Sequence, residues 1–327
     1  MGGRIIEERD MPSEVCRVSE MVRSLMFAAV LFGVVLGGLC MADERVLLTV
    51  RSPRRFELPT LGIWEDDSRK QDRFYRYLSA SFPGVPEFTT DLWCFESHGI
   101  TYASARALAD GRVEMRHTWE AKPWEIVTTA TPLADGLELV SRLVAKDDAA
   151  SPKPAEYPNL NVCWQLRRAA LFASEPEPYP EFVRRCFIFT DQGRTFLLDT
   201  QRRPIPVKPP THARNTPPWV QMYLPKGAPK ELRAGSSGWA DYSPDRYTEP
   251  VIGAVSRDGK YLAALAAGNE SVVSQAWHDC MHNNPGWMPA KEGSSKEWRI
   301  RLYVMENDPD LLLERFKRDF PDVARWR

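Results

Sequence analysis

The stretch Arg112-Val-Glu-Met-Arg-His-Thr-Trp119 decides the fold class of this chain. Its side chains alternate between two sets, and an alternation with a period of two is typical of a β-strand with one buried face. The set assigned to the core is Val113, Met115, His117 and Trp119, and the opposite set is Arg112, Glu114, Arg116 and Thr118. We therefore predict a strand with one core face and one face that is open or lines a groove.

Four short turn motifs separate further stretches of this kind. An Asp-Gly pair suits the positive φ angles of a two-residue hairpin, and Asp-Gln-Gly suits a turn followed by a left-handed glycine. The motifs are Asp110-Gly111, Asp135-Gly136, Asp191-Gln192-Gly193 and Asp258-Gly259. The strands predicted around them are 101–108, 112–119, 124–131, 137–144, 183–190, 195–198, 251–255, 261–266, 271–277 and 298–304. Many strands joined by hairpins predict a mainly β protein, an antiparallel β-sandwich.

Helix signals are few. Asp308-Pro309-Asp310 offers an N-cap, a proline at the first helical position and an early acid. Leu312, Phe316 and Phe320 then recur every four residues until Pro321, which predicts a C-terminal helix packed on the sheets. A second, short helix is expected at 68–78. The run Cys186-Phe-Ile-Phe189 is apolar throughout and predicts a strand covered on both faces.

The N-terminal residues are interpreted as an export signal. No charged residue lies between Ser24 and Ala42, and Cys40-Met-Ala42 supplies the small residues that a signal peptidase reads. We expect cleavage after Ala42 and a periplasmic or extracellular protein. The alternative is an uncleaved membrane anchor, because the uncharged stretch just reaches the roughly 18 residues that begin to span a bilayer.

The predicted organisation follows from these signals. The segments are 1–20, an unstructured extension or a misassigned start; 21–42, the signal peptide or anchor; 43–90, an N-terminal segment with the short helix; 91–306, the sandwich, with a long proline- and aromatic-rich loop at 201–250; and 307–327, the C-terminal helix and tail.

The charge of the chain is nearly balanced. Lys and Arg number 43 against 44 Asp and Glu, for a net charge of −1, and no long run of either sign occurs. The chain therefore lacks the electrostatic footprint of a nucleic-acid-binding protein. It also lacks a glycine-rich phosphate loop, a nucleophile elbow and a Cys-x-x-Cys pair, and we expect no cofactor.

Four cysteines follow the predicted cleavage point: Cys94, Cys163, Cys186 and Cys280. In an oxidising compartment they allow three complete pairings, and the sequence does not choose among them. Their wide, irregular spacing is not that of a disulfide scaffold, and buried thiols are the alternative.

The sequence also resembles a known superfamily. The strand 112–119, followed by Thr129-Ala-Thr-Pro-Leu-Ala-Asp-Gly-Leu-Glu-Leu139, resembles the β-meander of the galactose-mutarotase-like supersandwich. The later stretches 255–263, 277–285 and 299–306 are similar to exported sandwich proteins of environmental bacteria. The resemblance spans roughly 91–306 and implies a fold that handles carbohydrate. Mutarotases use a histidine acid and a glutamate base, but their motifs do not match this chain residue by residue, so no catalytic role is transferred.

The main candidate site is Trp277-His-Asp-Cys-Met-His-Asn-Asn-Pro-Gly-Trp287, which holds two of the five histidines. In a strand, His278, Cys280 and His282 share a face, but the two histidines lie about 13 Å apart, too far for one metal ion. In a helix the two histidines are neighbours and Cys280 points elsewhere, but the Asn-Asn-Pro-Gly sequence opposes a helix. We assign no metal ligands and expect His278 or His282 to transfer a proton or bind substrate.

We predict that the segment 277–287 borders a concave pocket, with His278 or His282 exposed to it and Trp219 or Trp239 across from it. Further residues are candidates for function. His117 and Arg116 are proposed as catalytic, and Glu96-Ser-His98 also sets a carboxylate near an imidazole. The candidates for substrate binding are Trp277, Trp287, Trp219, Trp239 and Asn283, since indole rings stack on sugar rings. Each of these residues also has a structural interpretation, as a core residue or as an anchor for a loop.

Two functions are consistent with these observations. The first is an exported carbohydrate-binding or carbohydrate-active protein, an epimerase, lyase or hydrolase that uses histidine acid–base chemistry. The second is a noncatalytic cell-envelope or polysaccharide-binding protein with the same sandwich. Catalysis by proton transfer requires two titratable groups at one pocket, whereas binding requires only an aromatic platform. The partner expected in both cases is a poly- or oligosaccharide.

Overall fold

The computed structural model describes most of the residues beyond 100 and shorter segments before them. The described residues are 47–50, 77–82, 85, 89–94, 100–119, 122–146, 150, 153, 157, 160, 162–166, 169–172, 179–200, 221–228, 241–268, 271–275, 280–285 and 297–323. All of them belong to one compact unit, Asp43–Arg327.

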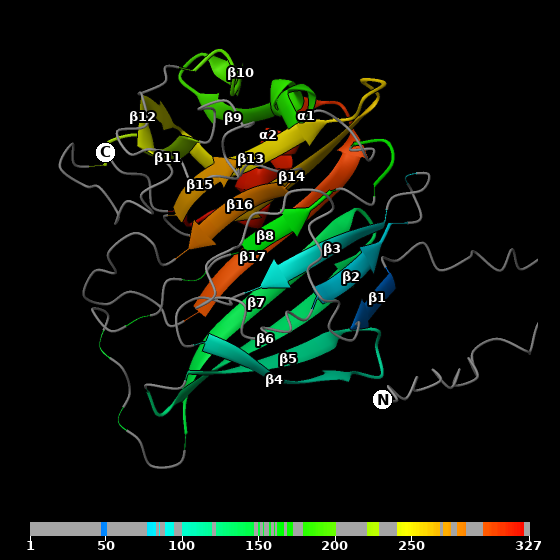
Figure 1. Cartoon of the computed structure of the whole chain (residues 1–327), viewed down its shortest axis with the longest axis vertical. Coiled ribbons are helices and arrows are strands. Elements are labelled where there is room, and N and C mark those ends of the chain that lie inside the picture. The colour runs from blue at the N-terminus through cyan, green and yellow to red at the C-terminus, as the bar shows by residue number, and fades with distance from the viewer. Residues whose placement is uncertain are drawn as a thin grey trace, which may run out of the picture. The chain divides into compact units, whose positions relative to one another are not determined.

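The described chain is built on two β-sheets (Figure 1). In spatial order, the eight-stranded sheet consists of β1 (Leu47–Val50), β2 (Tyr77–Ser81), β3 (Thr89–Cys94), β8 (Val162–Gln165), β16 (Cys280–Pro285), β15 (Ser271–Gln275), β11 (Gln221–Pro225) and β12 (Asp241–Tyr247). The nine-stranded sheet consists of β10 (Gly193–Phe196), β9 (Cys186–Thr190), β13 (Glu249–Val255), β14 (Tyr261–Ala267), β17 (Glu297–Glu306), β7 (Gly136–Ala145), β6 (Trp124–Leu133), β5 (Val113–Trp119) and β4 (Ile100–Ala107). The helices are α1 (Tyr179–Arg185) and α2 (Pro309–Asp319).

Neighbouring strands pair antiparallel, with one exception among the described strands. β11 and β12 run parallel, with Gln221 opposite Asp241. The mainly β, antiparallel sandwich with a C-terminal helix that the sequence predicts is therefore confirmed. The eight-stranded sheet also includes β1 and β2, so the sandwich begins before residue 91, the boundary predicted from the sequence.

The main core lies between the two sheets. It contains Trp164 and Met281 from the eight-stranded sheet and Ile126, Ile252 and Leu302 from the nine-stranded sheet, all of them fully buried. In β5 the alternation buries Val113, Met115 and His117 and leaves the residues between them partly exposed, as predicted.

A second core covers the outer face of the nine-stranded sheet. There α2 packs Leu312 and Phe316 against Phe187 of β9 and Leu262 of β14. Because β9 lies between two cores, four of its five residues are buried, as the apolar run 186–189 predicts. The N-cap of α2 is confirmed as Asp308, whose side chain accepts hydrogen bonds from the backbone N–H groups of Asp310 and Leu311.

The four predicted turns all connect antiparallel neighbours. Gly111, Gly193 and Gly259 have φ angles of 82°, 84° and 76°, in the left-handed region that these motifs require. The second turn differs from the prediction, because Leu133 pairs with Gly136 and the turn residues are therefore Ala134 and Asp135. Gly136 is a strand residue that lies against the neighbouring backbone, since a Cβ added to it would collide with the carbonyl oxygen of Leu302.

Other predicted elements are corrected by the structure. Val183–Arg185 ends helix α1 and does not begin a strand. The predicted loop 201–250 contains β11 and β12, and the predicted strand 271–277 ends at Gln275, with β16 starting at Cys280. Residues 77 and 78 belong to β2, and the remainder of the short helix predicted at 68–78 lies outside the described residues.

Candidate functional site

His282 lies on the outer face of the eight-stranded sheet. Trp164 of β8 and Met281 of β16 belong to the core, so the alternation of side chains along a strand turns Cys163, Cys280 and His282 outward. His282 is directly opposite Cys163 in the pairing of the two strands. Cys280 and His282 therefore share a face, as expected for a strand, while His278, the third member of the predicted set, lies outside the described residues.

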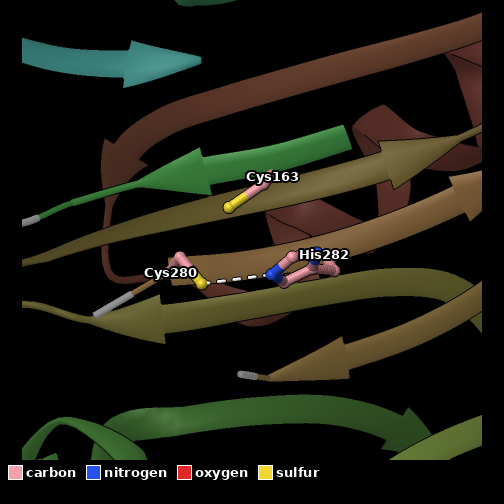
Figure 2. A group of neighbouring side chains, drawn as sticks. All are labelled: Cys163, Cys280 and His282. Atoms are coloured by element: carbon pink, nitrogen blue, oxygen red, sulfur yellow. Dashed lines mark hydrogen bonds between the residues drawn. The ribbon is translucent and has the colours of Figure 1, made fainter. Parts of the chain in front are cut away.

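These three side chains form a compact cluster (Figure 2). The Sγ atom of Cys280 lies 3.2 Å from Nε2 of His282, and the three ligand-type atoms all lie within 4.8 Å of one another. Cys163 and Cys280 are buried, with 1% and 0% of their surface exposed, whereas His282 is partly exposed. Gln165, next to the cluster on β8, donates a hydrogen bond from Nε2 to the Sγ atom of Cys163 at 3.1 Å.

Cys163 is the member that sequence reasoning missed. It comes from a strand remote in sequence, and only the pairing of β8 with β16 brings it to His282. The signal available in the sequence was the pair Cys280 and His282, two residues apart in a strand pattern. Among the described residues, Cys163, Cys186 and Cys280 are thiols that form no disulfide, while the side chain of Cys94 is outside the described set.

Asn283 faces the opposite way, into the sandwich. It is fully buried, and its Nδ2 donates to the backbone carbonyls of Pro250 at 2.8 Å and Leu265 at 3.2 Å, both in the nine-stranded sheet. This placement favours a structural role over the predicted role in substrate binding.

His117 is also buried inside the sandwich, on the core face of β5, with 3% of its surface exposed. Burial lowers its pKa to about 4, because a charged imidazolium loses its hydration there. The side chain is therefore neutral at physiological pH and poorly suited to transfer a proton to a substrate in solvent.

Arg116, the neighbour of His117, points to the outer face of the same sheet. Its guanidinium contacts carboxylates on both sides, Glu114 through Nε at 3.2 Å and Glu125 through Nη1 at 3.2 Å. Arg106 also pairs with Glu114, and this hydrogen bond lowers the pKa of the Glu114 carboxyl. The charge of Arg116 is thus offset within a ladder of ion pairs across β4, β5 and β6.

The remaining sequence candidates lie outside the described residues: His98, Trp219, Trp239, Trp277, His278 and Trp287. The predicted pocket that joins His278 or His282 to a loop tryptophan is therefore untested, and so is the predicted N-terminal signal or anchor. Neither helix of the described chain has the length and apolar character of a membrane span.

Comparisons with protein families and with curated proteins find no match to this chain. The candidate site must therefore be interpreted from its own geometry.

Proposed function

We propose that the protein is an exported carbohydrate-binding β-sandwich protein that recognises its ligand without converting it. The two large, mainly antiparallel sheets agree with the sandwich that the superfamily resemblance implies. A shared architecture is only an analogy for function, because one fold hosts many activities. The proposal therefore rests on how the candidate residues and strand ends are placed.

The described candidates for catalysis do not meet. His117 points into the core from the nine-stranded sheet, Arg116 points away from that core, and His282 lies on the outer face of the other sheet. A proton-transfer site needs an acid and a base within reach of one reacting group. This arrangement favours binding over the acid–base chemistry that was the other expectation.

The observation that carries the binding proposal is the meeting of four strand ends in the eight-stranded sheet. The first residues of β11 and β12, Gln221 and Asp241, are direct partners. Met222 pairs with Ser274, which brings the end of β15 to the start of β11, and Gln275 pairs with Met281 at the start of β16. We call this the β11–β12 end of the sheet.

Three tryptophans are connected to the β11–β12 end by very short segments. Trp219 precedes Gln221, Trp239 precedes Asp241 and Trp277 follows Gln275, each by two residues. Two residues span at most about 7 Å, and we propose that these three tryptophans contribute their rings at this end. Indole rings gathered there would form a stacking platform for sugar rings, with polar N–H groups at its edge.

Trp287 provides the contrast. It follows Pro285, the last residue of β16, and Pro285 pairs with Ser271 at the other end of β15. β15 is five residues long, so the two ends of the strand are about 13 Å apart. β16 therefore runs between the two ends of the sheet, and only the residues that precede it belong to the proposed platform.

The test is a binding screen of the purified chain against neutral and acidic poly- and oligosaccharides, followed by calorimetry on any ligand found. Trp219→Ala, Trp239→Ala and Trp277→Ala are each expected to weaken binding roughly 10-fold or more, the equivalent of about 1.4 kcal/mol. His278→Ala is expected to weaken binding with little change in melting temperature.

Trp287→Ala is the matched control, because it removes the same ring from the opposite end and should leave affinity unchanged. A wild-type protein that binds no member of the screen would contradict the proposal. Equal losses in Trp287→Ala and the other three variants would contradict the platform.

A further inference from the structure

The cluster of Cys163, Cys280 and His282 has the donor set of a metal site. Thiolate and imidazole ligands select Zn(II) and Cu(I) over the hard cations that prefer oxygen. Three protein ligands from two Cys and one His are also sufficient for a zinc site whose fourth position is taken by another ligand. Among the described residues, three ligand-type side chains come together in this cluster.

The spacing of the donor atoms fits one ion. Tetrahedral zinc, with Zn–S of about 2.3 Å and Zn–N of about 2.0–2.1 Å, places two sulfurs about 3.8 Å apart and a sulfur and nitrogen about 3.5 Å apart. The Cys280 and His282 atoms are 3.2 Å apart, and no pair in the cluster exceeds 4.8 Å. The 3.2 Å separation is close to the value for a sulfur and a nitrogen on one zinc ion, and the value for two sulfurs lies within the 4.8 Å bound.

A disulfide is the first competing explanation, and the strand register opposes it. Cys163 is opposite His282, so Cys280 is its diagonal neighbour, two residues along β16. Diagonal neighbours in an antiparallel pair are about 7–8 Å apart, beyond the roughly 4.4–6.8 Å that separates the Cα atoms of a disulfide. The strand register thus brings the two thiols close together but does not favour a disulfide between them.

A reactive cysteine paired with histidine is the second competing explanation. A nucleophilic thiolate must be accessible to its substrate. Cys280 has no exposed surface and Cys163 has 1%. Their burial opposes nucleophilic chemistry, whereas two thiolates in this position would neutralise the charge of a bound divalent cation.

Gln165 supplies a hydrogen bond of the kind that supports the ligands of a metal site. Its Nε2 donates to the Sγ atom of Cys163 at 3.1 Å, and Gln165 is 1% exposed. Hydrogen bonds of this kind fix the orientation of a ligand and stabilise negative charge on it. Gln165 is also the direct partner of Cys280 in the sheet, so it lies beside both sulfurs.

We propose that Cys163, Cys280 and His282 bind one Zn(II) ion that ties β8 to β16. The ligands are the two Sγ atoms as thiolates and Nε2 of a neutral His282. Binding therefore displaces two thiol protons to solvent, Zn²⁺ + 2 R–SH giving Zn(S–R)₂ + 2 H⁺. The inference is independent of carbohydrate binding, and its readouts use no sugar.

The experiment is metal titration of the reduced, metal-stripped full chain, first with Co(II) as a spectroscopic probe and then with Zn(II). One Co(II) per chain is expected, with thiolate-to-cobalt charge-transfer bands that Zn(II) abolishes. Calorimetry in buffers of different ionisation enthalpy is expected to show about two protons released. Zn(II) should also raise the melting temperature.

Single substitutions test which residues bind the Zn(II) ion. Cys163→Ser, Cys280→Ser and His282→Gln are each expected to weaken Zn(II) binding by at least roughly 100-fold, and Gln165→Leu by roughly 10–100-fold. Cys186→Ser is the matched control, because Cys186 is a buried thiol of the other sheet whose Sγ contacts the carbonyl of Phe182. His282→Gln keeps both thiols and decides the question if a serine variant fails to fold.

Three results would overturn the proposal. They are the absence of stoichiometric Co(II) or Zn(II) binding by the wild type, unchanged binding in the three ligand variants, and a Cys163–Cys280 disulfide in peptide maps of the untreated protein.

Discussion

The side-chain amide of Asn283, on β16, donates a hydrogen bond to the backbone carbonyl of Leu265, on β14 of the opposite sheet, at 3.2 Å. A second bond from the same Nδ2 reaches the carbonyl of Pro250 at 2.8 Å. A polar group in a core needs hydrogen bonds to offset its lost hydration, and here the acceptors belong to the opposite sheet. Asn283 therefore fixes how the two sheets are placed against each other, one residue from the outward-facing His282.

Replacing Asn283 should destabilise the protein without a direct effect on any ligand. Asn283→Ala removes two buried hydrogen bonds and is expected to lower the free energy of unfolding by about 1–3 kcal/mol. Urea denaturation measures this, with Thr129→Ala on the partly exposed face of β6 as a control that should change stability by less than about 0.5 kcal/mol. If Asn283→Ala were as stable as the wild type but bound ligand more weakly, the result would support the predicted role of Asn283 in substrate binding.

The nine-stranded sheet is the part of the fold that the sequence predicts well. Its long strands alternate and are joined by local turns, so β5, β6 and β7 are predicted with their ends displaced by two residues or fewer. The eight-stranded sheet is predicted poorly. β8 has four residues, all of them buried, and its partners β3 and β16 are remote in sequence. Neither periodicity nor turn chemistry identifies such a strand, because its pairing is decided by tertiary contacts.

The candidate site, too, could be predicted from the sequence only in part. The shared face of Cys280 and His282 follows from the two-residue period of a strand, and so does the core position of His117. The approach of Cys163 does not follow, because it depends on which residue of β8 lies opposite His282. A local sequence pattern holds no information on that register.

A cluster of charged residues attaches α2 to β17. Asp319, at the end of α2, accepts a hydrogen bond from the hydroxyl of Tyr303 at 2.9 Å and lies 3.0 Å from Nη1 of Arg301. The side chains of Asp319 and Arg301 are only 7% and 13% exposed. Burial, followed by the negative charge of Asp319, raises the pKa of the Tyr303 hydroxyl far above its usual value.

Asp319→Asn should therefore loosen the C-terminal helix. It removes the charge that compensates Arg301, and breaking a buried ion pair costs about 3–5 kcal/mol, less here because Asp135 also contacts Arg301 at 3.4 Å. We expect a loss of about 2–3 kcal/mol in urea denaturation. Asp322→Asn, in the exposed tail after α2, is the control. A loss as small as that of the control would show that the cluster does not stabilise the helix.

His117 should make the protein sensitive to acid. Its pKa is about 4 in the folded chain and about 6.5 when unfolded, so the unfolded state binds more protons between these values. Stability is fully present above pH 6.5 and falls as the pH drops toward 4, by about 3 kcal/mol in total from this residue. Urea denaturation at several pH values measures the slope.

His117→Leu should flatten that slope whatever its effect on stability at pH 7. Thr118→Ala, on the partly exposed outer face of the same strand, should leave the slope as it is in the wild type. An identical acid dependence in His117→Leu and the wild type would show that other groups cause it.

The last prediction distinguishes two reasons why a position in the chain requires glycine. Gly259 has a φ of 76° and nothing within 4 Å of an added Cβ, so only the backbone conformation requires it. Gly259→Val should cost on the order of 1 kcal/mol or more, whereas Gly259→Asn should cost less, because Asn tolerates the left-handed region. Gly136 has the opposite reason, since its Cβ would collide with the carbonyl oxygen of Leu302. Gly136→Ala should therefore cost about 3 kcal/mol or more, because β7 and β17 must separate to admit one methyl group. Thermal denaturation of the three variants measures these costs. If Gly136→Ala were as stable as Gly259→Asn, β7 and β17 would lie farther apart than the pairing of Leu302 with Leu137 indicates.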